Sequence, residues 1–151
     1  MRLKLIWPGK TKEPFIREGI RKYVEGIRNM GSPGGSLEIA EIKEEKFLKP
    51  TDVALKAEGE RILKQAGGSF VLLDEKGITM GSEEFARWLE KGTEWRFVLG
   101  GPYGVSPELR KLARARLSFS RMTFPHELMR VMLLEQLFRA LTILKGKGYH
   151  H

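Results

Sequence analysis

The chain has 151 residues and contains no cysteine, which excludes a disulfide framework, a thiolate metal site and a cysteine nucleophile. Hydrophobic residues make up 41% and charged residues 30% of the sequence, a balance typical of a soluble globular protein and unlike that of a disordered chain. The length predicts one domain over residues 1–151, and the net charge of +8 favours a polyanionic partner. No stretch approaches the roughly 20 apolar residues of a membrane span. The apolar run at the start is too short for a signal peptide, so we expect a cytoplasmic protein.

The first half of the chain alternates predicted strands with predicted helices. An apolar run over residues 2–7, ended by a Pro-Gly pair, predicts a strand. Apolar residues at helical spacing over 12–30 predict an amphipathic helix. Alternation over 36–43 predicts a second strand, and a helix follows from Thr51 to Gln65.

The second half repeats this alternation, with the clearest buried strand at its start. The predicted elements are a strand at 69–74, a turn at Gly77, a helix over 82–91, a strand at 95–101, a helix opened by Ser106 and Pro107, a strand at 116–120 and a long helix over about 126–145. Five strands alternating with helices predict an α/β fold built on a mostly parallel sheet with helices on both faces.

The last helix has apolar residues on more than one side. They are Leu128, Val131, Met132, Leu134, Leu137, Phe138, Leu141 and Ile143. A helix this broadly apolar favours a covering partner such as a second subunit.

Ligands of open α/β sheets bind beyond the carboxyl ends of the strands, and three such ends stand out. They are 72–74, the glycine-rich segment 99–104 and the segment 119–125. The glycines allow a ligand to approach the backbone closely, although a tight turn without a ligand explains them equally well. Segment 119–125 could offer backbone groups to an adenine edge or be an ordinary loop before a helix.

Few single residues suggest chemistry on their own. We interpret His126, at a helix start, as structural. Glu135 and Arg139 are four residues apart, as in a surface ion pair, but Arg139 could also be a partly buried functional arginine. His150 and His151 could be a genuine tail or the start of a purification tag. No metalloprotease, hydrolase or Walker motif is present, and we predict no metal site.

The positive charge is concentrated near the end of the chain. Residues 109–151 hold nine basic and two acidic side chains, whereas 51–108 hold more acidic than basic ones. This surplus predicts a surface that contacts phosphates, with chance skew of a solvated surface as the alternative.

Several motifs together resemble the ribosomal large subunit methyltransferase H family of SPOUT-class enzymes. They are LGGPYG (99–104), LSFSRMTFPHELMRVMLLEQLFRA (117–140) and the terminal Tyr149-His150, with support from the first strand and its Gly9, Glu58–Glu60 and Phe70–Asp74. The resemblance spans essentially the whole chain. Tyr103 stands where some relatives carry a glutamate, and the tail lacks the His-Pro that some relatives have before the tyrosine.

The resemblance implies an enzyme that transfers a methyl group from S-adenosylmethionine to N3 of a pseudouridine. The target lies in helix 69 of 23S rRNA on the assembled ribosome. The resemblance further implies a homodimer and a C-terminal trefoil knot that binds the cofactor, and it gives no role to a metal, a membrane or DNA. The cofactor residues by motif position would be Leu73, Gly100, Gly101, Phe119, Ser120, Arg121, Met122, Thr123 and Phe124.

The same resemblance suggests the catalytic residues Arg139, Tyr149 and His150. Arg139 could stabilise negative charge on the target base, His150 could accept its proton and Tyr149 could position the ring. The alternatives are a SPOUT methyltransferase acting on another RNA such as tRNA, and a basic RNA-binding module without catalysis.

Overall fold

The computed structural model describes residues 1–46 and 51–146. Five strands alternate with five helices, as the sequence predicts. In chain order they are β1 (Arg2–Pro8), α1 (Pro14–Asn29), β2 (Ser36–Ile42), α2 (Thr51–Ala66), β3 (Val71–Thr79), α3 (Ser82–Glu90), β4 (Glu94–Val98), α4 (Pro107–Leu112), β5 (Ala115–Ser118) and α5 (His126–Gly146).

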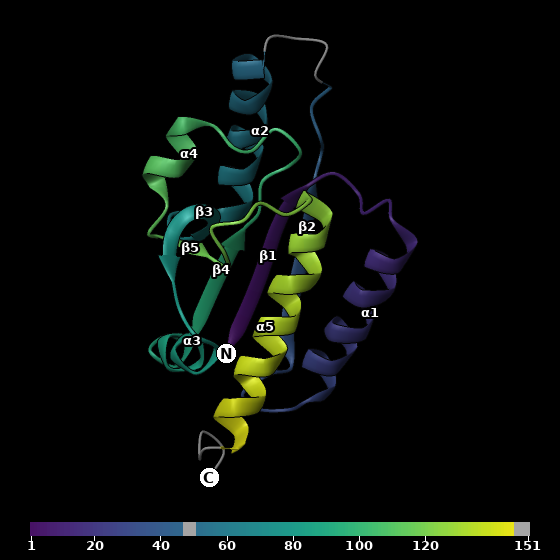
Figure 1. The fold of residues 1–151 in the computed structure, drawn as a ribbon, viewed down its shortest axis with the longest axis vertical. Coiled ribbons are helices and arrows are strands. Elements are labelled where there is room, and N and C mark those ends of the chain that lie inside the picture. Colours follow the sequence, from purple (N-terminus) through teal and green to yellow (C-terminus); the bar gives the residue numbers. More distant parts are fainter. Residues whose placement is uncertain (47–50, 147–151) are drawn as a thin grey trace.

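The strands form one sheet in the order β2-β1-β4-β3-β5, and each neighbouring pair is parallel. The predicted α/β fold is therefore confirmed, with a sheet that is parallel throughout its named strands. Parallel strands end at the same edge of a sheet, so the loops after β1, β2 and β4 meet there. Figure 1 shows α5 starting near that edge and running toward the opposite end of the molecule.

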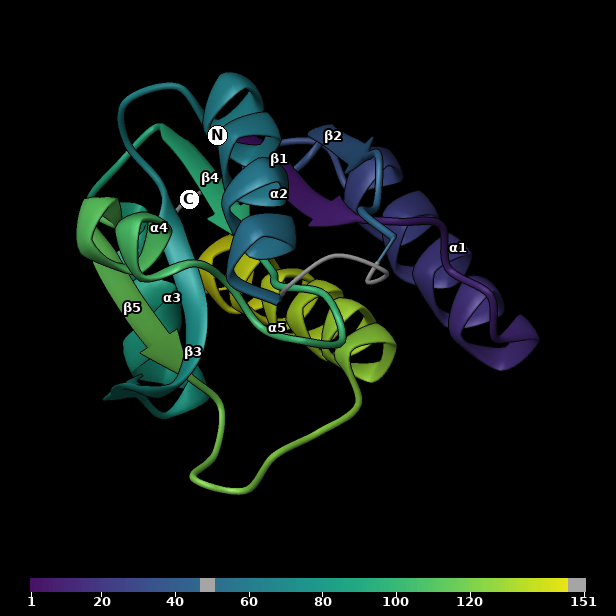
Figure 2. The ribbon, with the colours of Figure 1, turned by 90° about the horizontal axis from the view of Figure 1, so that it is seen from above.

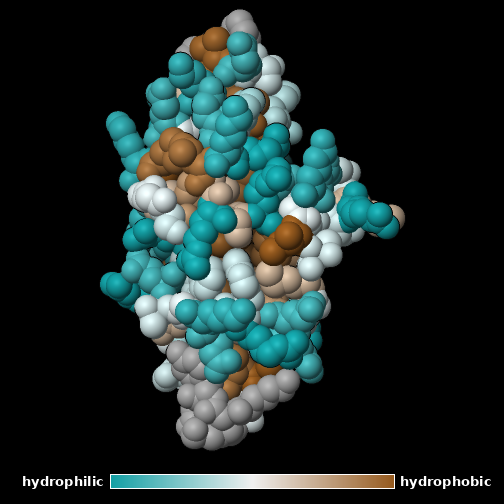
Figure 3. All heavy atoms as spheres, turned by 90° about the vertical axis from the view of Figure 1, so that its left-hand side faces the viewer, coloured by the Kyte–Doolittle hydropathy of each residue, from teal (hydrophilic) through white to brown (hydrophobic). Residues whose placement is uncertain are grey.

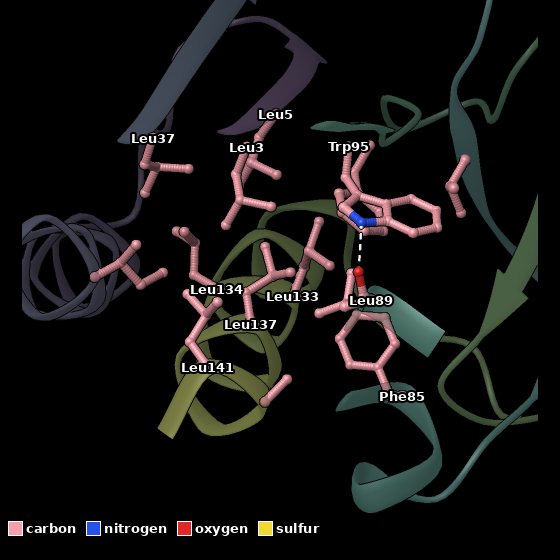
Figure 4. Packing of buried hydrophobic residues seen from close by; sticks show 14 of the residues in the cluster. Leu3, Leu5, Leu37, Phe85, Leu89, Trp95, Leu133, Leu134, Leu137 and Leu141 are labelled. Carbon is pink, nitrogen blue, oxygen red and sulfur yellow. Dashed lines mark hydrogen bonds between the residues drawn. The ribbon is translucent and has the colours of Figure 1, made fainter. Parts of the chain in front are cut away.

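Alternate residues of the strands supply two hydrophobic cores, one on each face of the sheet. Leu3 and Leu5 point into the larger core, where they meet a row of leucines from α5 (Figure 4). On the same side, the Trp95 indole donates a 2.9 Å hydrogen bond to the Leu89 carbonyl of α3. Ile6 points the other way and packs with Ile62 of α2.

Gly77 lies within β3 and does not form the predicted turn. The pairing of β3 with β5 shifts register between Leu73 and Ile78. A Cβ on Gly77 would lie 2.5 Å from the Arg116 carbonyl carbon, so only glycine allows this approach of the two backbones. A lone glycine fits a turn or a bulge equally well in sequence, and here the strand continues through a bulge.

The apolar residues of α5 divide into a buried face and a partly exposed one. Leu134, Leu137 and Leu141 of the predicted set are fully buried. The rest of that set is half-buried, while Leu133 and Leu144, absent from it, belong to the core. Among the half-buried residues, Val131 and Phe138 lie against α1, while Leu128 and Met132 share the outer side of the helix with Glu135 and Arg139.

The surface of the described residues is mixed in character. On the face that carries α3, α4 and β5, hydrophilic side chains predominate and hydrophobic ones form separate patches (Figure 3). Within residues 1–46 and 51–146, no helix combines the length and apolar character needed to cross a bilayer.

Candidate cofactor cleft and active site

A cleft of about 250 Å³ lies between the loop that follows β4 and the loop that follows β5. Eight of the nine predicted cofactor residues line it, namely Leu73, Gly100, Gly101, Phe119, Ser120, Met122, Thr123 and Phe124. Arg121, the ninth, is exposed and is not part of the lining. The structure thus brings two segments about 20 residues apart in sequence to one cleft, as the sequence predicts.

The glycine-rich loop makes a tight turn at the rim of this cleft. The Gly104 N–H donates a 3.1 Å hydrogen bond to the Gly101 carbonyl, with Pro102 and Tyr103 at the tip. Gly104 has a φ of +82°, a conformation that favours glycine. A Cβ on Gly100 would come within 3.0 Å of the Gly104 oxygen, so glycine at 100 keeps the two limbs of the loop together.

The second loop is shaped by short hydrogen bonds between its own residues. The Ser118 hydroxyl donates to the Ser120 carbonyl at 2.8 Å, and the Ser120 hydroxyl accepts from the Met122 N–H at 2.9 Å. Such local bonds favour a turn over continuation of the strand. The loop therefore leaves β5 and bulges away from the sheet before α5 begins (Figure 2).

The interior of the cleft is apolar and its rim is charged. Leu99, Leu117 and Met129 contribute to the lining beside the predicted residues. At the rim, the Asp74 carboxylate accepts from the Arg110 Nε at 3.0 Å and lies 3.5 Å from an Arg116 nitrogen. Asp74 was expected only as a strand end, and its ion pairs show that it holds Arg110 in place beside the cleft.

His126 also lines the cleft, which its position at a helix start did not predict. The side chain is half-buried, and burial lowers the pKa of its imidazole, with the nearby Arg130 cation adding to the effect. A lowered pKa favours the neutral imidazole, which can accept a hydrogen bond or donate one.

Arg139, a predicted catalytic residue, does not line the cleft. Its side chain is 54% exposed on α5 and is ion-paired with Glu135, as in the surface-pair interpretation. Thirteen residues separate it from His126, which at helical rise is about 20 Å. Tyr149 and His150, the other two predicted catalytic residues, lie outside the described residues, as does His151.

Most basic residues of the last third have partners within the chain. Arg110 and Arg116 share Asp74, Arg139 pairs with Glu135, and the Lys145 ammonium donates to the Met30 carbonyl. The Arg114 guanidinium lies over the Trp95 ring. These interactions leave fewer cations of this region to contact a polyanion than the sequence count indicates.

Arg130 is a buried arginine to which the sequence analysis gave no role. It is fully buried, and its guanidinium donates to the Pro8 carbonyl at 2.7 Å and to the Thr11 hydroxyl at 2.8 Å. One signal was available, because Arg130 falls at helical spacing with Leu133 and Leu137. Burial lowers the pKa of Arg130, but an arginine keeps its charge at neutral pH.

The described residues include no group of three or more histidine, aspartate or glutamate side chains placed to hold a metal ion. The cleft thus consists of backbone groups, apolar walls and a charged rim. This chemistry suits an organic ligand with a flat ring and a polar end.

Comparison with solved structures supports the fold. The tRNA (m1G37) methyltransferase of Aquifex aeolicus superposes with a TM-score of 0.57 at 14% identity, over 93% of this chain and 71% of that one. The family model described as a predicted SPOUT methyltransferase matches residues 1–150. The chain thus has the fold of the SPOUT methyltransferase class and matches its family model.

Similar sequences identify the family within this class. Proteins named ribosomal RNA large subunit methyltransferase H are 45% identical in Geotalea daltonii, over all of both chains, and 42% identical in Thermodesulfovibrio yellowstonii, over 99% of both. The protein of that name in Geobacter sp. is 42% identical over all of this chain and 99% of its own length. This chain belongs to the ribosomal RNA large subunit methyltransferase H family.

Proposed function

We propose that this protein transfers the methyl group of S-adenosylmethionine to N3 of a pseudouridine in helix 69 of 23S rRNA, on the assembled ribosome. The observation that carries the proposal is the end-to-end similarity to relatives named for large-subunit RNA methylation, at 42–45% identity. The cleft supports it, because the motifs that carry this similarity line one cavity.

The residues that line the cleft suit the methyl donor chemically. Gly100 and Gly101 expose backbone at one wall, and Phe119 with Leu117 offers apolar surface for an adenine ring. Ser120, Thr123 and the backbone of the second loop can hydrogen-bond to the polar atoms of the nucleoside. The donor supplies a methyl group already activated by a sulfonium, so the chain must chiefly hold and align the reactants.

The remaining chemistry is the loss of the N3 proton. We propose that His150 accepts this proton, directly or through a water, and that Tyr149 positions the base. The negative charge left on the two flanking carbonyl oxygens is stabilised by hydrogen bonds from the Arg139 guanidinium. A bond forms from N3 to the methyl carbon as the sulfur–carbon bond breaks, so no redox partner is required.

The distance of Arg139 from the cleft supports a homodimer. A separation of about 20 Å along α5 is too long for Arg139 to serve the cleft of its own chain. Leu128 and Met132, half-buried on the same side of α5 as Arg139, offer apolar surface to a second copy. We therefore propose that Arg139 of one protomer acts at the cleft of the other.

The proposal includes a trefoil knot at the C-terminal end. The order of the elements supports it, because β5 lies at the edge of the sheet while α5 packs beneath the central strands, between α1 and α3. In the proposed knot, the chain that joins β5 to α5 passes through the loop after β4.

The decisive experiment is mass spectrometry of nucleosides after incubating the protein and S-adenosylmethionine with ribosomes that lack the modification. We expect N3-methylated pseudouridine from assembled ribosomes and none from tRNA. Methylation of tRNA alone would favour the alternative substrate. Calorimetry with S-adenosylmethionine tests the alternative of a binding module, which would release no heat.

A further inference from the structure

A second hollow, larger than the cofactor cleft, lies on the other side of the glycine-rich turn. This groove of about 980 Å³ is lined by the loops that follow β1, β2 and β4. The turn separates the two, because Gly100, Gly101 and Gly104 line the cleft while Pro102 and Tyr103 line the groove. Any molecule seated in the groove therefore lies next to the proposed methyl donor.

Four exposed lysines line this groove: Lys10, Lys12, Lys43 and Lys46. Within the described residues, the structure records no ion pair for any of their ammonium groups. This contrasts with the last third of the chain, where most cations have partners.

The groove also holds three carboxylates, of which Glu41 is exposed and accepts a 3.1 Å hydrogen bond from the Trp7 indole. Glu45 is largely buried and lies 2.7 Å from an Arg61 nitrogen. Glu41 and Glu44 are close enough to the buried Arg130 to raise its pKa against the larger effect of burial. The four lysines outnumber the three carboxylates, one of which is buried against Arg61, so the lining carries a net positive charge.

The two lysine-bearing segments are held in place by buried groups. Glu58 accepts the Glu45 N–H at 2.9 Å, and an Arg61 nitrogen donates to the Lys43 carbonyl at 3.3 Å. On the other segment, the Glu127 carboxylate accepts the Lys12 N–H at 3.0 Å.

The segments are also tied to each other by a 2.9 Å bond from the Gly9 N–H to the Ile42 carbonyl. Backbones fixed in this way leave only the lysine side chains to be ordered when a ligand binds.

Tyr103 adds an aromatic ring at the lip of the groove. It occupies the tip of the tight turn and is 57% exposed. A tyrosine ring offers a face on which any base can stack, and lysines beside such a ring can bind the flanking phosphates.

We propose that this groove binds the RNA strand around the target nucleotide, with phosphates on the four lysines and a base stacked on Tyr103. This inference rests on the proposed function and names the surface that delivers its substrate. It moves the main RNA contact from the last third of the chain to the loops after β1 and β2.

The test compares two quadruple variants with the same net charge. One replaces Lys10, Lys12, Lys43 and Lys46 by alanine, and the control replaces the exposed Lys22, Lys64, Lys91 and Lys111. Binding to ribosomes is measured at several salt concentrations, together with calorimetry of S-adenosylmethionine binding to each variant.

We expect the groove variant to bind ribosomes at least about tenfold more weakly, with a logarithmic salt slope shallower by about 3. The control variant should keep the wild-type slope, and both should bind S-adenosylmethionine normally. Wild-type affinity and slope in the groove variant would overturn the inference. Failure of the wild-type protein to methylate any RNA would instead overturn the proposed function.

A second comparison isolates Tyr103. We expect Tyr103→Ala to raise KM for ribosomes about tenfold and Tyr103→Phe to restore it, because stacking needs the ring and not the hydroxyl. Equal loss in both variants, or no loss in Tyr103→Ala, would exclude stacking.

Discussion

The guanidinium carbon of Arg130 lies 4.9 Å from the centroid of the Trp7 ring, so a buried cation of α5 lies over an aromatic ring near the end of strand β1. The same guanidinium holds the Pro8 carbonyl and the Thr11 hydroxyl. One arginine thus fixes the loop after β1, which carries two lysines of the groove, to the helix whose start lines the cleft. Arg130 therefore links a segment that lines the groove to the helix that lines the cofactor cleft.

Replacing Arg130 by alanine should therefore destabilise the protein. The change opens a cavity and leaves the Pro8 carbonyl without its buried donor, so we expect a loss of about 3–5 kcal/mol in the free energy of unfolding. Urea denaturation measures it. Arg139→Ala, on the exposed side of the same helix, is the matched control and should change stability by less than about 0.5 kcal/mol. Equal effects would contradict the structural role of Arg130.

The sequence predicted elements better than it predicted which face of an element is buried. Short apolar runs at 70–73 and 97–99 mark the buried parts of β3 and β4, and helix α4 begins at a proline, so local signals were strong. Arg130 and Arg139 lie on one helix whose apolar residues surround it. Helical spacing alone could not decide which arginine faces the core, because that depends on how α5 packs against β1.

The candidate site was likewise predicted only in part. Recognisable motifs at strand ends predicted the cleft residues, which the parallel sheet then brings together. The groove was not predicted, because its lysines lie on two loops that are far apart in sequence and carry no motif. His126 was missed as a cleft residue, because only the folded chain brings it to the cleft, whereas Asp74 belongs to a predicted strand end and only its ion pairs were not foreseen.

Glu58 should make stability depend on pH. Burial raises the pKa of its carboxyl, with the Glu44 charge adding to the effect and the Glu45 N–H opposing it. A raised pKa in the folded state means that the stability contributed at low pH is lost as pH rises from the ordinary glutamate pKa through the folded value.

We therefore expect Glu58→Gln to become more stable relative to wild type as pH rises, because the amide keeps an acceptor and carries no charge. Urea unfolding at pH 4 and pH 8 tests this, with the exposed Glu60→Gln on the same helix as control. A stability difference between Glu58→Gln and wild type that does not vary with pH would refute the assignment.

Gly100→Ala should weaken binding of the methyl donor. The added Cβ would press on the Gly104 oxygen and on Val105, each 3.0 Å away, and so displace the wall of the cleft. We expect at least about a tenfold rise in the dissociation constant of S-adenosylmethionine, measured by calorimetry. Gly68→Ala meets no atom within 4 Å and should bind normally. Normal binding by Gly100→Ala would remove this loop from the cofactor site.

Arg139→Ala should lower turnover strongly and leave donor affinity nearly unchanged, because the residue lies far from the cleft of its own chain. Mixing the Arg139→Ala and Gly100→Ala proteins tests whether Arg139 acts at the cleft of the other protomer. Activity is measured at a donor concentration near the wild-type dissociation constant. If Arg139 serves the partner's cleft, half of the randomly formed dimers contain one intact site, and about a quarter of wild-type activity returns. If each chain used its own Arg139, no intact site would form, and the mixture would be no more active than the separate variants.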